Sequence, residues 1–268
     1  MINICKLFRK TKKPTITFYS LCPEVTALAP VLPATKFRPE VLLNASKEYA
    51  EKKQEPDFGT SLFTSIAKCP GIYDYARLGW VITAWQDIVI ETNGDGSSFT
   101  WTTPLDQTKM TNGKLVGEMV SFHARNQYFD YIGSNPNALD CVIKFNTPWR
   151  VIVPEGYYLK EGHLPYSNER RFTALDGVFD GDFQYTSLNI QVLWHVMEGK
   201  TLIKAGTPLA HYYLVPKDQP ELVVKTATPE QIMAENAIKA VAEMAYVTDV
   251  KRSKCIRHSI IKGVRDAK

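Results

Sequence analysis

The middle of the chain alternates apolar and polar residues with a period of two, which predicts β-strands. A hairpin is expected over residues 80–103, because strand-forming stretches at 79–91 and 99–103 flank the turn sequence NGDGSS. Gly94 and Gly96 favour this turn because glycine adopts positive φ without steric cost. Further short strands are expected at 141–145, 149–153, 156–159, 172–175, 188–194 and 208–214. Short strands separated by prolines and glycines are typical of a sandwich or barrel.

Helical periodicity appears in two places. Residues 40–53 carry apolar side chains on one side of a short helix. Residues 228–246 form the clearer prediction, because Thr228 can cap the helix, proline follows at the first helical position, and Gln231 can complete a capping box. The apolar stripe of this second helix predicts packing either on its own domain or on another subunit.

The intervening segments define the expected domain organisation. Residues 15–25 predict a short strand, and four prolines between residues 23 and 39 exclude a long helix and predict an extended arm. The polar, turn-rich stretch 104–140 predicts a long excursion from the β-domain. We therefore divide the chain into four parts: a basic tail (1–13), a β-rich globular domain (14–217), a helix (228–246) and a second basic tail (247–268).

Composition narrows the class of protein. The 268 residues include 44% hydrophobic and 22% charged residues, which is ordinary for a globular protein. No apolar run is long enough to span a membrane, and no apolar stretch follows the basic N-terminus, so we expect neither a transmembrane segment nor a signal peptide. The five cysteines are an odd number without a C-x-x-C pair, which favours free thiols in a reducing compartment.

Basic residues concentrate at the two ends of the chain. Residues 1–13 contain five lysines and arginines and no acidic residue, and residues 251–268 contain seven with one aspartate. Such ends suggest contact with an anionic partner: nucleic acid, a membrane surface or the acidic face of a neighbouring subunit. Solvated tails that act only in solubility are the alternative. The candidate contact residues are Lys10, Lys12, Lys13, Lys251, Arg252, Lys254 and Arg257.

Three short motifs occur in a shared order within residues 145–216: VIVPEGYY at 151–158, LDGVFDGDF at 175–183 and KAGTPLAH at 204–211. Their order and spacing resemble those of the trimeric dUTPases. The resemblance implies a mainly β fold with a dUTPase-like barrel of the β-clip kind, extended by an N-terminal arm, an additional hairpin and a C-terminal helix. It also implies a homotrimer.

The resemblance assigns roles to particular residues. Asp180 matches the aspartate that activates water for attack on phosphorus, and Phe183 matches a tyrosine that lies against the deoxyribose. Ser167 and Asp182 become candidate ligand-binding residues, with Mg²⁺ as cofactor if the chain hydrolyses nucleotides. The chain departs from the family pattern at several points: Tyr166 replaces the arginine before the serine, and Phe183 lacks the tyrosine hydroxyl. The family's upstream A-G-x-D-L motif has no clear counterpart, and the glycine-rich closing motif is absent. We therefore expect no pyrophosphatase activity and no cofactor.

The stretches FYSLCPEV, CPGIYDYARLGW and AGTPLAHY, within residues 16–217, resemble an uncharacterised family of marine-phage-type proteins. That likeness implies a non-enzymatic structural or assembly protein in the virion or host cytoplasm, with other virion proteins as partners. The alternatives are a nucleotide-binding protein or dUTPase-like pyrophosphohydrolase with a pocket around Asp180, and a nucleic-acid-binding accessory protein that uses the basic tails. The five histidines have no metal-ligand spacing, so no metal site is expected.

Overall fold

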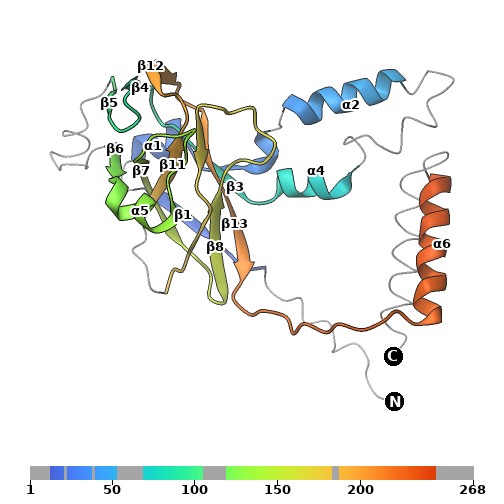
Figure 1. Ribbon diagram of the computed structural model, residues 1–268. Coiled ribbons are helices and arrows are strands. Elements are labelled where there is room, and N and C mark those ends of the chain that lie inside the picture. The colour runs from blue at the N-terminus through green and yellow to red at the C-terminus, as the bar shows by residue number, and fades with distance from the viewer. Residues whose placement is uncertain are drawn as a thin grey trace. The chain divides into compact units, whose positions relative to one another are not determined.

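The computed structural model describes residues 13–20, 23–37, 40–52, 69–104, 119–182 and 187–245. The chain divides into two compact units, one of residues 1–41 and 71–218 and the other of residues 42–70 and 219–268. The described residues form thirteen strands in antiparallel sheets and a few helices, so the expected mainly β fold class is confirmed (Figure 1). None of the described helices is long and apolar enough to cross a membrane.

The first unit contains three sheets. The first sheet has the order β1 (Thr17–Ser20), β7 (Val142–Ile152), β11 (Ser187–Trp194) and β9 (Phe172–Ala174), and β6 (Val120–His123) also pairs with β7. The second sheet has the order β10 (Gly177–Phe179), β8 (Tyr157–Gly162), β13 (Pro208–Pro216), β3 (Trp80–Thr83) and β2 (Leu32–Pro33). In the third sheet, β4 (Ile88–Asn93) lies between β12 (Glu198–Ile203) and β5 (Phe99–Thr102).

Short helices connect these strands. The first unit has α1 (Pro23–Leu28), η2 (Ala34–Lys36), α4 (Pro70–Arg77) and α5 (Arg125–Ile132). Most of α2 (Glu40–Lys52) and all of α6 (Pro229–Ala245) belong to the second unit. The capping box of α6 is confirmed: the Gln231 amide accepts a hydrogen bond from the Thr228 backbone N–H, and the Thr228 hydroxyl accepts one from the Gln231 backbone N–H.

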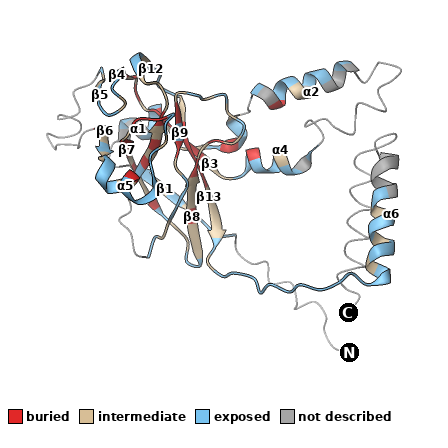
Figure 2. Ribbon diagram, viewed as in Figure 1, coloured by how far each residue is buried: buried red, intermediate tan, exposed pale blue. Residues whose placement is uncertain are grey.

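Alternating side chains of the strands form one main core. Phe145 on β7 and Ile190 on β11 are fully buried, as are Leu159 and Tyr212 of the second sheet. Figure 2 shows that the buried residues gather on the strands. The core therefore consists of side chains that recur at every second position of the strands, as the period of two in the sequence predicts.

The hairpin prediction is correct for its turn and wrong for its first strand. Gly94 and Gly96 have φ of 84° and 74°, and β4 pairs with β5 across this turn. The expected strand 79–91 is interrupted at Ala84, whose backbone N–H donates to Thr207 and whose carbonyl accepts from Gly206. The break sends β3 into the second sheet beside β13, so the hairpin comprises β4 and β5 alone.

The predicted break at Pro148 is also wrong, because β7 runs through it without interruption. The register with β11 shifts there: Arg150 pairs with Ser187, whereas Asn146 pairs with Asn189. The Thr147 hydroxyl donates to the Leu188 carbonyl at 2.7 Å, so a side chain supplies a bond within the irregular stretch. A bulge of this kind accommodates a residue that has no backbone N–H.

The proposed arm and the proposed excursion both contain short elements that the sequence did not predict. The proposed arm 23–39 holds α1, which begins at Pro23, because proline is well suited to the first helical position. The proposed excursion 104–140 contains β6 and α5, while its residues 105–118 lie outside the described part of the chain.

Candidate functional site

Lys217, just after β13, forms ion pairs with two of the three aspartates of the 175–183 motif, Asp180 and Asp182. Its Nζ lies 2.7 Å from Asp180 Oδ1 and is also paired with Asp182. The same ammonium lies 5.4 Å from the centroid of the Tyr158 ring. The Lys217 backbone N–H donates to the Gly156 carbonyl at 2.8 Å, which fixes the residue against the turn between β7 and β8.

This ion pair stabilises the ionised form of Asp180. The hydrogen bond from Lys217 lowers the pKa of the Asp180 carboxyl, and the two aspartates raise the pKa of the Lys217 ammonium. A general base is most effective when its pKa lies near the working pH. Asp180 is therefore an ionised, cation-paired carboxylate and a weak base.

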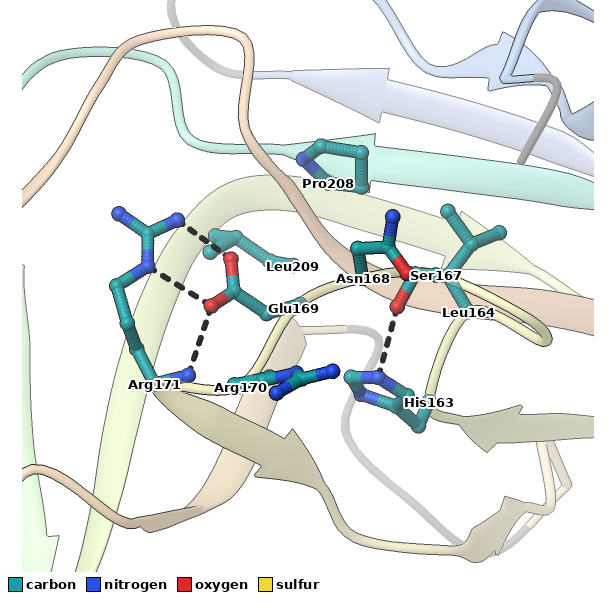
Figure 3. A pocket seen from close by; sticks show the side chains of 9 residues that line it. All are labelled: His163, Leu164, Ser167, Asn168, Glu169, Arg170, Arg171, Pro208 and Leu209. Carbon is teal, nitrogen blue, oxygen red and sulfur yellow. Dashed lines mark hydrogen bonds and ion pairs between the residues drawn. The ribbon is translucent and has the colours of Figure 1, made fainter. Parts of the chain in front are cut away.

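Ser167 lies in a different place, in a cavity of about 480 Å³ (Figure 3). Its Oγ is 2.9 Å from Nε2 of His163, and the Ala174 backbone N–H donates to Nδ1 of the same ring. Because Nδ1 accepts, a neutral His163 carries its proton on Nε2, and this N–H donates a hydrogen bond to the Ser167 oxygen. Burial lowers the pKa of His163, which favours this neutral form. His163 therefore positions the Ser167 hydroxyl and does not deprotonate it.

The same cavity presents two arginines in different states. Arg171 is held by Glu169, with Nε 2.8 Å from Oε1 and its backbone N–H 2.9 Å from the same oxygen. Figure 3 shows the Arg170 side chain extending toward His163. Among the described residues, the Arg170 guanidinium has no hydrogen-bond or ion-pair partner. The Asn168 amide lies 3.5 Å from the Glu40 carboxylate, to which it donates. A cation without a protein partner in a cavity that also presents the Ser167 hydroxyl can receive an anion.

A second cavity, of about 330 Å³, lies beside the 176–179 part of the motif. Glu161 lines it and accepts a hydrogen bond from the Tyr212 hydroxyl at 2.6 Å. Burial raises the pKa of the Glu161 carboxyl to about 7. Asp176, at the same cavity, is paired with Lys160.

The structure thus brings some of the candidate residues together and separates others. Asp180 and Asp182 share one lysine, whereas Ser167 lines a cavity to which neither contributes. Lys13 is exposed. The candidates outside the described residues are Phe183, Lys10, Lys12, Lys251, Arg252, Lys254 and Arg257. Within the described part of the chain, no three His, Cys, Asp or Glu side chains gather into a metal site.

Sequence reasoning missed Lys217 and Glu161. Lys217 lies 37 residues from Asp180, and Glu161 lies 51 residues from Tyr212. The only local signal was a glutamate on the apolar side of a strand that also carries Leu159.

The comparisons with known proteins assign no function to these residues. No protein-family model and no curated protein sequence matches the chain. Among solved structures, a native dUTPase of EIAV is similar over 56% of this chain and 87% of its own, with 7% sequence identity and a TM-score of 0.29. A likeness of this degree identifies neither a fold family nor a function.

Proposed function

We propose that the chain is a non-enzymatic structural protein of phage type, associated with the virion, whose β-domain is a scaffold for assembly. The observation that carries the proposal is the connection between β13 and α6. Residues 219–228 are all exposed, and Leu222, Val223 and Val224 are exposed by 85%, 69% and 85%. Three adjacent large aliphatic side chains in water are unfavourable, so a second protein surface is expected to cover them.

The state of the dUTPase-like residues supports a role without catalysis. Asp180 is paired with Lys217, which lowers the pKa of its carboxyl, and the Ser167 hydroxyl accepts a hydrogen bond from His163. Neither arrangement activates water or a nucleophile. The proposed scaffold is a β-clip barrel over residues 145–216 that forms a homotrimer, and the basic ends contact an anionic component of the particle.

Sedimentation equilibrium of the full-length chain tests the assembly role. We expect a species larger than the 30.3 kDa monomer that loses mass when Leu222, Val223 and Val224 are replaced together by serine. Leu28→Ser is the matched control, because Leu28 is 83% exposed on α1. A monomer across the accessible concentration range would remove the proposal, and equal effects of the triple variant and the control would remove the role of the 219–228 segment.

Nucleotide binding is a second candidate, supported by the Arg170 side chain in the cavity that Ser167 lines. If this cavity receives a nucleotide phosphate, Arg170→Gln should weaken dUTP binding by about ten- to a hundredfold, since a charge-assisted hydrogen bond contributes about 1.5–3 kcal/mol. Calorimetry with dUTP measures the effect, and Lys200→Gln on β12 is the control.

An activity assay tests the absence of catalysis: with dUTP and magnesium present, we expect no pyrophosphate release. Turnover that Asp180→Asn abolishes would contradict the non-enzymatic proposal.

A further inference from the structure

The segment 219–228 is extended, and it pairs with none of the strands in the described part of the chain. Figure 1 shows it as an extended trace leading into α6. No hydrogen bond joins residues 219–227 to any other residue that the structure describes. Backbone N–H and C=O groups without partners, next to three β-compatible apolar side chains, are the features of a strand that pairs with another chain.

The charges within the segment indicate which chain it pairs with. The sequence ELVVK places Glu221 and Lys225 symmetrically about Val223. In an antiparallel pair of identical segments centred on this valine, Glu221 of each copy faces Lys225 of the other. A parallel pair in register would instead set glutamate against glutamate and lysine against lysine, which is unfavourable.

We propose that residues 221–225 pair antiparallel with the same residues of a second copy, about a twofold axis through Val223. Leu222 of one copy then faces Val224 of the other, and Val223 faces itself. Because side chains alternate between the faces of a strand, Leu222 and Val224 of both copies form one wholly apolar face. Two ion pairs on the opposite face fix the register.

The prolines of the chain limit this contact to a short ribbon. Pro220 cannot donate a ladder hydrogen bond, and α6 begins at Pro229. A two-stranded ribbon of about five residues is only marginally stable alone. The pairing therefore acts as a weak link that becomes effective when other contacts hold two copies near each other. The inference rests on the proposed assembly role and names the partner surface for it.

Disulfide trapping tests the register. In full-length protein with Cys5, Cys22, Cys69 and Cys255 replaced by serine, Val223→Cys is expected to form a covalent dimer under mild oxidation. Directly opposed residues of an antiparallel pair have Cα atoms about 4.5–5.5 Å apart, within the range that a disulfide bridges. Val224→Cys is the matched control, since residues 224 of the two copies are about 8 Å apart in this register. A mixture of Leu222→Cys and Val224→Cys chains should give the heterodimer.

A charge exchange tests the ion pairs. On the Val223→Cys background, Glu221→Lys alone or Lys225→Glu alone sets like charges opposite each other twice, and we expect the cross-linking rate to fall about tenfold. The double variant restores opposite charges and should restore the rate. Cross-linking of Val224→Cys as fast as Val223→Cys, or a double variant no faster than the single ones, would overturn the proposed register.

The two proposals fail separately. If the chain sediments as an oligomer that depends on the three aliphatic residues and yet Val223→Cys does not cross-link, the twofold pairing is wrong and the assembly role stands. A strictly monomeric protein contradicts the assembly role itself.

Discussion

Glu161 and Tyr212 are direct partners across β8 and β13, and both lie where a charge is poorly solvated. Alternation along β8 places Glu161 on the same face as the fully buried Leu159. Burial raises the pKa of the carboxyl to about 7, although the hydrogen bond from Tyr212 acts in the opposite direction. A backbone hydrogen bond from Gln191 and the charge of Lys160 also lower the pKa, so desolvation exceeds the combined stabilisation of the charged form.

This carboxyl should make the stability of the protein depend on pH. The folded protein binds the proton more tightly than the unfolded chain, whose glutamate has a pKa of about 4.5. The stabilisation of the folded state by the protonated Glu161 carboxyl is therefore present at low pH and is lost as the pH rises from about 4.5 through 7. Between pH 5 and pH 8.5, the wild type should lose about 2 kcal/mol of unfolding free energy relative to Glu161→Gln.

Urea unfolding at the two pH values measures this difference, because the glutamine variant keeps an acceptor for Tyr212 and removes the titration. Glu198→Gln, a change of the same kind at an exposed residue of β12, is the control and should show no such difference. Equal pH dependence of the wild type and Glu161→Gln would show that the carboxyl is better solvated than its position implies.

At the scale of elements, the junction between α4 and β3 depends on one glycine. Gly79 has φ of 74°, and a Cβ there would lie 1.9 Å from the Tyr212 carbonyl oxygen. The approach is close because Trp80, the next residue, pairs directly with Tyr212 of β13. The Gly79 carbonyl also accepts a hydrogen bond from the Ala34 backbone N–H at 3.0 Å, so the junction cannot move without disturbing η2, which begins at Ala34.

Gly79→Ala should therefore lower the free energy of unfolding by about 3 kcal/mol, through the left-handed conformation and the displacement of β13. Gly71→Ala is the matched control, because a Cβ at this position of α4 meets nothing within 4 Å. It should stabilise by about 0.5 kcal/mol, since alanine loses less backbone entropy. Thermal unfolding of both variants separates strain from helix propensity. Similar melting temperatures for the two would contradict the steric argument.

Elements whose signals are local were predictable from the sequence. The Gly94 and Gly96 turn and the α6 capping box each depend on residues within four positions of one another. The break at Ala84 was not predictable, because its hydrogen-bond partners lie more than 120 residues away. The continuity of β7 through Pro148 depends likewise on a register shift in β11. Sequence periodicity predicts that a segment is a strand, but it does not predict with which other strand the segment pairs.

The same distinction holds for the candidate site. The motif at 175–183 identified Asp180 and Asp182, because a resemblance compares residues that are adjacent in sequence. It could not identify Lys217, whose approach depends on how β13 ends beside the turn at Gly156. The functional state of Asp180 as a paired carboxylate was therefore accessible only through the tertiary structure.

At the scale of the whole molecule, the proposed contacts combine two symmetries. A trimer formed by the β-domain has a threefold axis, and the pairing of residues 221–225 adds a twofold axis between trimers. A closed trimer alone would stop at three chains, whereas twofold links between trimers extend the assembly. Each link is weak, so extension requires several of them at once. If both proposed contacts form, the assembly would grow through many marginal links, as the proposed role in a particle requires.

The basic ends give the last prediction at this scale, argued from the sequence. Deletion of residues 1–13 and 251–268 should leave the fold intact, because neither segment has the apolar pattern of a core element. Binding to a DNA duplex and to polyglutamate should weaken steeply between 50 and 500 mM salt and be lost on deletion, because charge attraction is screened and does not depend on sequence. Fluorescence anisotropy of the labelled probes measures both effects.

The same tail could bind in a different way, by burial of its apolar residues Cys255, Ile256, Ile260 and Ile261 against a partner. Salt-insensitive binding that still requires residues 251–268 would favour that docking, and binding unaffected by the deletion would leave both ends as solubility segments.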